Sequence, residues 1–255
     1  MFDVLSSAGS PEAQASVRRL LDVPGAKKDP GLYSMLIQRF ALVGSPTPES
    51  IAHLRDLERT SDGDLSRAAL VSRSAALGKR LAAGDQDAEL EARDLLARAR
   101  GDLSNATAAG RDALVKAIGN MRHPDATTAL EKHAKDIEPG VRASVATALG
   151  RSRSDQASKL LLQMMSDEDS FVARSAISAH LGRRLTAEEL GAFADHVRFQ
   201  PTNAQADAPL ASAIVQHSTT DATKVRQGLD TLLARAPENS EHAGRLRAAI
   251  AGLGA

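Results

Sequence analysis

Histidines are the side chains in this sequence best suited to bind a metal ion, because seven are present and there is no cysteine. A zinc-protease helix places two histidines four residues apart with a glutamate between them, and no two histidines here have that spacing. His123 comes before Pro124 in an expected turn, and His180 lies within an apolar helical stretch. We assign structural hydrogen bonds to both, ahead of a partner contact for His180. We therefore expect no metal ion and no cofactor.

The acidic run from Asp167 to Asp169 could hold a cation, since carboxylates are among the ligands that calcium prefers. The run also comes directly before an expected helix start at Phe171. Acidic side chains at that place cap the first turn and favour the positive end of the helix dipole. They are also placed to pair with Arg142 or Arg174. We assign the run to capping first and to cation binding second.

Motifs for catalysis are missing from the sequence. It contains no glycine-rich phosphate-binding loop, and its scattered serines, histidines and aspartates do not by themselves define a catalytic triad. We predict that the protein is not an enzyme and assign no catalytic residue.

The composition predicts helices and excludes two classes of partner. Hydrophobic residues make up 42% of the chain but aromatic residues only 2%, so the apolar content favours helices over strands. Lys and Arg together number 32, as do Asp and Glu, which leaves no basic surplus for a nucleic acid. No apolar run approaches the roughly 18 residues of a membrane span. The first residues do not begin a signal peptide.

One pattern occurs three times in the middle of the chain, in segments that end at Gly119, Gly150 and Gly182. These glycines are 31 and then 32 residues apart. Each segment has an arginine eight residues before its glycine and aliphatic residues five and one before it, which places both aliphatic side chains on one helical face. The glycine suits the left-handed position that ends a helix. A second apolar stripe follows, so each repeat is predicted to be a helical hairpin.

Weaker copies of the pattern occur upstream. Residues 5–13 resemble residues 40–48, and another helix of this kind reaches Gly78. The next spacing, from Gly78 to Gly119, is 41 residues, which indicates an insertion. We place this inserted helix at about residues 85–101, where charged residues accompany an apolar stripe.

The repeats together predict the fold class and the domain organisation. We expect an all-α protein, a right-handed α-solenoid of about seven helix pairs that stack on one another. The whole chain, residues 1–255, is predicted to be one domain, with its most regular repeats at residues 110–197. Its C-terminal helices, in residues 208–255, are expected to be less regular.

The stretch from Val141 to Gly150 and its copies resemble the bacterial HEAT repeat, most clearly over residues 110–182. A second set of motifs resembles the superhelical part of the vitellogenin and apolipoprotein group of large lipid-transfer proteins. These motifs are Ala8 to Ala13, Val43 to Pro46, Arg67 to Gly78 and Lys116 to Pro124. That resemblance implies a helical arm that would support a lipid cavity supplied by flanking sequence. Because the first helix looks half-length, we expect the chain to be a fragment of a longer protein, extracytoplasmic if that protein transports lipid.

The surface expected to bind a partner is the concave face, which second helices of successive pairs form in HEAT-like proteins. Removing the apolar stripe from these helices leaves a mixed polar surface with one aliphatic residue. The predicted partner-binding residues are Thr128, Glu131, Lys132, Lys135, Lys159, Leu162, Gln163, Glu189 and Asp195. Leu162 is the aliphatic member and a candidate anchor, although single exposed apolar residues are common on protein surfaces.

Three functions follow from these observations. The first is a non-catalytic scaffold that presents its concave face to a protein or peptide. The second is the structural arm of a lipid-transport protein, with lipid bound only if flanking domains are present. The third is a HEAT-fold enzyme such as a bilin lyase or an alkyl-DNA glycosylase, and the neutral charge and the absence of tryptophan disfavour the glycosylase. We favour the scaffold.

Overall fold

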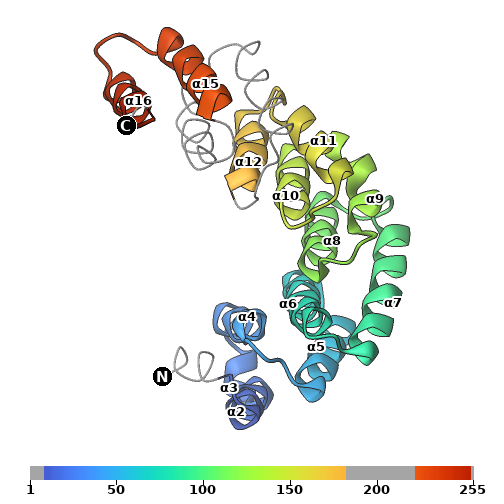
Figure 1. Ribbon diagram of the computed structural model, residues 1–255. Helices are drawn as coiled ribbons and strands as arrows, with labels where there is room; N and C mark the ends of the chain where they lie inside the picture. The colour runs from blue at the N-terminus through green and yellow to red at the C-terminus, as the bar shows by residue number, and fades with distance from the viewer. Residues whose placement is uncertain (1–8, 182–221, 254–255) are drawn as a thin grey trace. The chain divides into compact units, whose positions relative to one another are not determined.

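The computed structural model describes residues 9–181 and 222–253, and the elements in these ranges are all helices (Figure 1). The predicted all-α fold is therefore confirmed. The chain divides into two compact units, Met1–Leu130 and Glu131–Ala255. The single continuous domain, the superhelical handedness and the number of helix pairs stay predictions. None of the described helices combines the length and apolar character that crossing a membrane requires.

The first unit, called unit 1, is a two-layer stack of helices. Its helices are α2 (Pro11–Asp22), α3 (Pro24–Lys27), α4 (Pro30–Arg39), η1 (Phe40–Leu42), α5 (Pro48–Thr60), α6 (Gly63–Ala82), α7 (Gln86–Asp102), α8 (Ala108–Met121) and α9 (Ala126–Leu130). The helices α4, α6 and α8 pack in a row as the first layer, and α5, α7 and α9 form the second layer against them (Figure 1). The helix pairs α6 with α7 and α8 with α9 make two of the predicted hairpins, and α5 packs on α6.

Apolar side chains from both layers fill the core of unit 1. Leu21, Ile37 and Leu54 are completely buried, and Phe40 and Tyr33 supply the aromatic rings of this cluster. Burying side chains of this size contributes about 1.5–3 kcal/mol each. The apolar stripes that predict these helices from the sequence therefore also form the core that holds the helices together.

The second unit, called unit 2, has the same two-layer construction. Its helices are η2 (Glu131–Lys135), α10 (Pro139–Leu149), α11 (Asp155–Met164), α12 (Ser170–Leu181), α15 (Ala222–Arg235) and α16 (Glu241–Gly252). The helices α10 and α12 pack together as the first layer, and η2 and α11 form the second. The expected C-terminal helices appear as α15 and α16, which pack against each other. Gly182 and the start of the 208–255 segment lie outside the described residues.

The helix expected as an insertion at about residues 85–101 is α7, and it serves as the second helix of the pair that α6 begins. The long spacing between Gly78 and Gly119 arises because α6 and α7 have 20 and 17 residues. In the later pair, α10 and α11 have only 11 and 10 residues. The extra residues therefore lengthen one hairpin.

The prediction that the repeat glycines end helices in a left-handed conformation is wrong for Gly78, Gly119 and Gly150. Gly78 and Gly119 lie inside α6 and α8, and Gly150 at the end of α10 is right-handed, with φ −59°. Two of them allow helices of the first layer to approach closely. A methyl group at Gly78 would overlap the carbonyl oxygen of Asn120 in α8, and one at Gly150 would lie 2.8 Å from the Ala179 methyl in α12. The glycines are needed for packing between repeats.

The two Gly-Ser-Pro motifs that suggested a lipid-transfer protein are joined by one buried side chain. Gln14, which is 1% exposed, donates from its amide nitrogen to the carbonyl oxygens of Gly9 and Ser45, both at 2.9 Å. Its amide oxygen accepts from the Thr47 nitrogen at 2.9 Å and the Ser50 hydroxyl at 3.0 Å. Four hydrogen bonds satisfy this buried amide fully. The motifs thus have a structural role, which is to fix the starts of α2 and α5.

Candidate functional site

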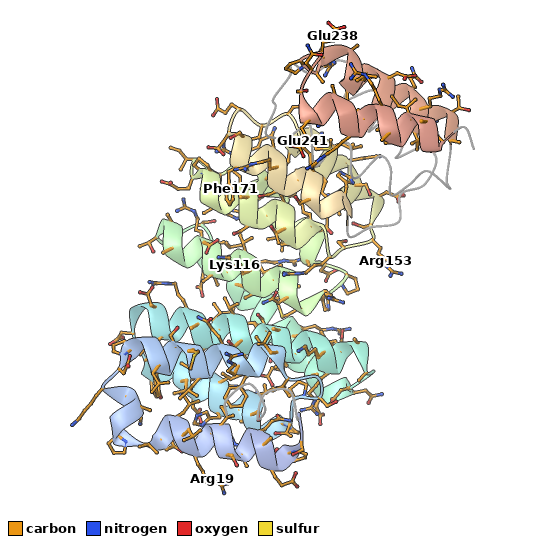
Figure 2. All side chains as sticks on the ribbon, turned by 90° about the vertical axis from the view of Figure 1, so that its left-hand side faces the viewer. Arg19, Lys116, Arg153, Phe171, Glu238 and Glu241 are labelled. Atoms are coloured by element: carbon orange, nitrogen blue, oxygen red, sulfur yellow. The ribbon has the colours of Figure 1, made fainter. Side chains whose placement is uncertain are left out.

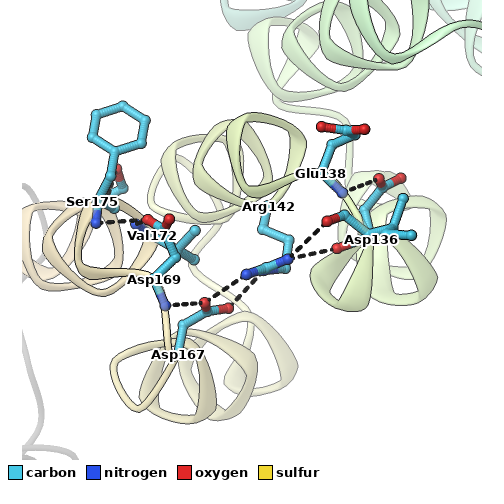
Figure 3. A network of polar contacts seen from close by, with 9 residues as sticks. Asp136, Glu138, Arg142, Asp167, Asp169, Val172 and Ser175 are labelled. Carbon is cyan, nitrogen blue, oxygen red and sulfur yellow. Dashed lines mark hydrogen bonds and ion pairs between the residues drawn. The ribbon is translucent and has the colours of Figure 1, made fainter.

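The acidic run before α12 belongs to a structural network around Arg142, shown in Figure 3. Arg142 is buried in α10 and makes a two-pronged ion pair with Asp167, at 2.7 and 2.8 Å. A third bond joins it to the Asp136 carbonyl at 2.8 Å. The Asp167 carboxylate raises the pKa of Arg142 by hydrogen bonding to its charged form. The sequence-based pairing of this run with Arg142 is confirmed.

Asp169 of the same run caps α12. Its carboxylate accepts from the backbone nitrogens of Phe171 and Val172, at 2.8 and 3.2 Å. Capping of this kind stabilises a helix by about 1 kcal/mol. Within residues 9–181 and 222–253, no cluster of three histidine or carboxylate side chains is arranged to hold a metal ion. The assignment to capping is confirmed, and the geometry gives no support to the cation site.

The two histidines singled out in the sequence are both buried. His123 accepts from the Asp125 nitrogen at 3.2 Å, and its other ring nitrogen lies 3.4 Å from Glu89, so its structural hydrogen bond is confirmed. His180 is only 1% exposed, at the end of α12. A residue buried to this degree is not available on the surface for a partner.

The residues predicted to bind a partner lie in the second layers of the two units. Thr128 belongs to α9 of unit 1. In unit 2, η2 carries Glu131, Lys132 and Lys135, and α11 carries Lys159, Leu162 and Gln163. All of these are exposed except Leu162, which is half-buried.

A side-chain hydrogen bond links the two second-layer helices of unit 2. The Glu131 carboxylate accepts from the Gln156 side chain at 2.9 Å, which joins η2 to α11. Glu189 and Asp195 lie outside the described residues. The structure brings the unit 2 residues together on one layer, and their binding role stays a prediction.

An open groove of unit 1 lies instead on its first layer. A groove of about 1000 Å³ runs over α4, α6 and α8, and we call it the first-layer groove. Its lining residues are Pro30, Gly31, Ser34, Met35, Gln38, Arg39, Ala41, Leu42, Asp64, Leu65, Arg67, Ala68, Val71, Ser72, Ala109, Asp112, Ala113 and Lys116. Figure 2 looks onto this layer, with Lys116 labelled on α8.

Small side chains open the groove between helices that are otherwise tightly packed. The helices α6 and α8 touch at Gly78, while Ala68, Ala109 and Ala113 leave space nearer their first turns. Most of the groove surface is apolar, with contributions from Met35 and Leu65. A row of small residues one helical turn apart, as at Ala109 and Ala113, is the sequence signal that could have indicated it.

Leu42 gives the groove an exposed apolar end. The side chain is 63% exposed in η1, the short turn that follows α4. Lys79 of α6 fixes this turn by donating to the carbonyl oxygens of Ala41 and Val43, at 2.8 and 2.5 Å. Burial lowers the pKa of Lys79, and the nearby positive charge of Arg122 lowers it further. The exposed leucine therefore stands on an anchored turn.

Four of the five charged residues that line the groove pair with one another, and Arg39 is the fifth. Asp64 forms an ion pair with Arg67, one turn along α6. Asp112 pairs with Lys116 in α8 at 2.6 Å. The first-layer groove therefore has an apolar floor, and most of the charges at its rim are paired. Such a surface suits an apolar or amphipathic segment of a partner.

Comparison with known proteins identifies the repeats. A family model for HEAT repeats matches residues 92–181. No curated protein matches the sequence significantly. None of the matches found gives support to the lipid-transfer resemblance.

Several solved structures are similar over most of the chain. An engineered protein is 17% identical, with a TM-score of 0.48, over 100% of this chain and 74% of that one. The complex of CpcE and CpcF of phycocyanin lyase from Nostoc sp. PCC7120 is 15% identical, with a TM-score of 0.47, over 99% and 88%. A designed armadillo repeat protein in complex with the peptide (KR)4 is 15% identical, with a TM-score of 0.38, over 93% and 98%. With the family match and the helical hairpins of both units, the chain is a HEAT-like repeat protein whose HEAT repeats are recognised in residues 92–181.

Proposed function

We propose that this protein is a non-catalytic binding module that takes a peptide segment of a partner protein into the first-layer groove. The observation that carries the proposal is the groove itself, which has a volume of about 1000 Å³ and an apolar floor that crosses three helices. Contiguous exposed apolar surface on a helical protein marks interaction sites more often than isolated apolar residues do. We expect a peptide segment as the ligand because the floor is long and extends from the first turn of α4 to the middle of α8.

The rim charges define the chemistry of the partner. Because Asp64 pairs with Arg67 and Asp112 with Lys116, four of the five charged lining residues balance, and Arg39 leaves a single formal positive charge. Binding would gain its free energy mainly from apolar area removed from water, about 25 cal/mol per Å². The expected partner segment is amphipathic, with one apolar face that covers Met35, Leu42 and Leu65. Helix-in-groove recognition works in this way.

The second-layer residues predicted from the sequence form the competing surface. Lys132 and Lys159 are exposed on η2 and α11, so a partner bound there would depend on their charge. Leu42 and Ala109 are exposed in the first-layer groove and their replacement leaves the core untouched. These two pairs of residues allow the two surfaces to be compared directly.

The test selects binders from a displayed library of random peptides and measures their affinity for the purified protein by fluorescence anisotropy. Leu42→Glu and Ala109→Trp should each weaken binding about tenfold or more, because one places a charge on the floor and the other fills it. The double change Lys132→Glu with Lys159→Glu should leave the affinity unchanged. Affinity that responds only to the lysine changes would assign binding to the second layer and refute the groove, as would failure to select any peptide.

A further inference from the structure

Unit 2 has an open groove of its own between α10 and α12, with a volume of about 590 Å³, which we call the arginine groove. The helix α12 contributes one continuous stripe to it. The lining residues are Thr147, Gly150, Arg151, Phe171, Arg174, Ser175, Ser178 and Ala179. On α12 these residues are three or four positions apart, so they share one helical face. Phe171, labelled on α12 in Figure 2, is 54% exposed at the start of that stripe.

The floor of the arginine groove is made by residues with little or no side chain. Gly150 ends α10 directly against Ala179, where an added methyl group would be only 2.8 Å from the alanine methyl. The glycine that allows α10 and α12 to approach thus also leaves the floor bare. A ligand backbone can come close to a surface of this kind.

The charge of this groove differs from that of the first-layer groove. Arg151 and Arg174 line it, and none of the lining residues in this described part of the chain is acidic. Two carboxylates of the acidic run before α12 are engaged elsewhere, since Asp167 pairs with Arg142 and Asp169 caps α12. The groove is therefore positive within a chain whose formal charge is zero.

Arg174 occupies the same repeat position as Arg142 but has a different environment. Arg142 is held by both oxygens of Asp167. Arg174 donates from its Nε to the Ser170 carbonyl at 3.3 Å, and no carboxylate of the described residues pairs with it. The outer edge of a guanidinium is a two-pronged donor whose geometry matches a carboxylate. Arg142 uses its Nε and Nη2 on Asp167, whereas the Nε of Arg174 is engaged by Ser170 and the pair of Nη groups forms the edge that Arg174 can offer to a ligand.

Two hydroxyl groups of the groove are acceptors. Thr147 donates its proton to the Ala143 carbonyl at 3.0 Å, and Ser175 donates to the Phe171 carbonyl at 2.8 Å. Their oxygens therefore present lone pairs to the groove. Backbone N–H groups of an extended chain are suitable donors to them.

We propose that the arginine groove binds an acidic peptide segment, with a carboxylate on Arg174 and an apolar side chain against Phe171. Arg151 adds positive charge at the rim, and the bare floor at Gly150 admits the peptide backbone. This site is separate from the first-layer groove in residues, in unit and in the charge of its ligand. It does not rest on the function proposed for unit 1.

The test uses a short synthetic peptide in which glutamate alternates with leucine, titrated into the full chain by isothermal calorimetry at low salt. A matched peptide with lysine in place of glutamate should not bind, and added salt should weaken the glutamate peptide because charge pairing is screened. Arg174→Gln should lower the affinity about tenfold or more. Arg174→Lys should restore only part of it, because lysine keeps the charge and loses the two-pronged geometry.

Arg153→Gln is the matched control, since Arg153 is an exposed arginine of the same unit that does not line the groove. Ser178→Trp fills the groove from an exposed position and should abolish binding while circular dichroism stays unchanged. Equal losses for Arg153→Gln and Arg174→Gln would show nonspecific charge attraction and overturn the proposal. Binding of the lysine peptide, or no binding of the glutamate peptide, would also overturn it. Leu42→Glu should have no effect here, which separates this result from the unit 1 test.

Discussion

Replacing Gly78 by alanine tests whether the repeat glycines are present for helix packing. The new methyl group would overlap the Asn120 carbonyl oxygen and lie 3.2 Å from both the Asn120 carbonyl carbon and the Met121 Cα. Restoring ordinary contact requires the two helices to separate by about 1 Å. The obstacle is backbone, so no side chain can rotate away. We expect an overpacking cost near the upper end of the usual range, about 3 kcal/mol.

Alanine also favours a helix over glycine by about 1 kcal/mol, so the net loss expected for Gly78→Ala is about 2 kcal/mol. Gly101→Ala is the matched control in the same unit, because Gly101 is exposed in α7 with no atom within 4 Å of an added methyl group. That change should stabilise the protein by about 0.5 kcal/mol, less than in a helix interior because Gly101 lies in the last turn of α7. The same chemical substitution is therefore expected to have opposite signs at two helical positions.

Urea unfolding followed by far-ultraviolet circular dichroism measures both changes, and hydrogen exchange locates the loss in α6 and α8. The second packing glycine gives an independent comparison, because the Gly150 obstacle is the Ala179 methyl group. Gly150→Ala should be destabilising, and Ala179→Gly in the same chain should recover part of the loss. If Gly78→Ala were as stable as Gly101→Ala, the glycine would have no role in packing and the explanation of the repeat would be wrong.

Three further changes test individual contacts. Arg142→Met should lower the free energy of unfolding in urea by about 3 kcal/mol, because it leaves the Asp167 carboxylate without its partner. As a control, Arg245→Met breaks the exposed Arg245–Glu241 pair and should cost under about 0.5 kcal/mol. Equal costs would contradict the structural role of the network. Arg122→Gly should stabilise by about 1 kcal/mol, since Arg122 holds φ +53° at the end of α8, and an unchanged urea midpoint would refute this. Hydrogen bonds from Ala88 and then the ion pair with Arg80 lower the pKa of Asp85 in the folded protein, so its stabilising effect is present at neutral pH and is lost as the pH falls below the ordinary carboxyl pKa. Asp85→Asn should make the melting temperature less dependent on pH across that acidic range, and an identical pH profile would exclude the effect.

The helices were predictable because their causes are local. Apolar residues spaced by three and four placed α8, α10 and α12, and capping residues such as Asp169 marked a helix start. A pairing of the acidic run with Arg142 or Arg174 was also predictable, since the loops between these repeats are rich in acidic residues, and the structure selects Arg142. These signals need no knowledge of how one hairpin packs on the next.

The repeat glycines and the grooves required the tertiary structure. A glycine near a helix end is compatible with a left-handed cap and with close packing, and only the position of Asn120 against Gly78 separates the two. The first-layer groove depends on which faces of α4, α6 and α8 stay uncovered. The sequence pointed to the second layer, from the usual arrangement of HEAT-like repeats.

The sequence by itself determined that the chain is a set of amphipathic helical hairpins without catalytic motifs, because periodicity and capping are properties of short segments. The tertiary structure decided what those hairpins leave exposed. Two arginines at the same repeat position have different environments. Arg142 is buried and pairs with a carboxylate, whereas Arg174 lines an open groove. The physical reason is that burial and charge pairing depend on neighbours from other parts of the fold, which a similar local sequence cannot specify.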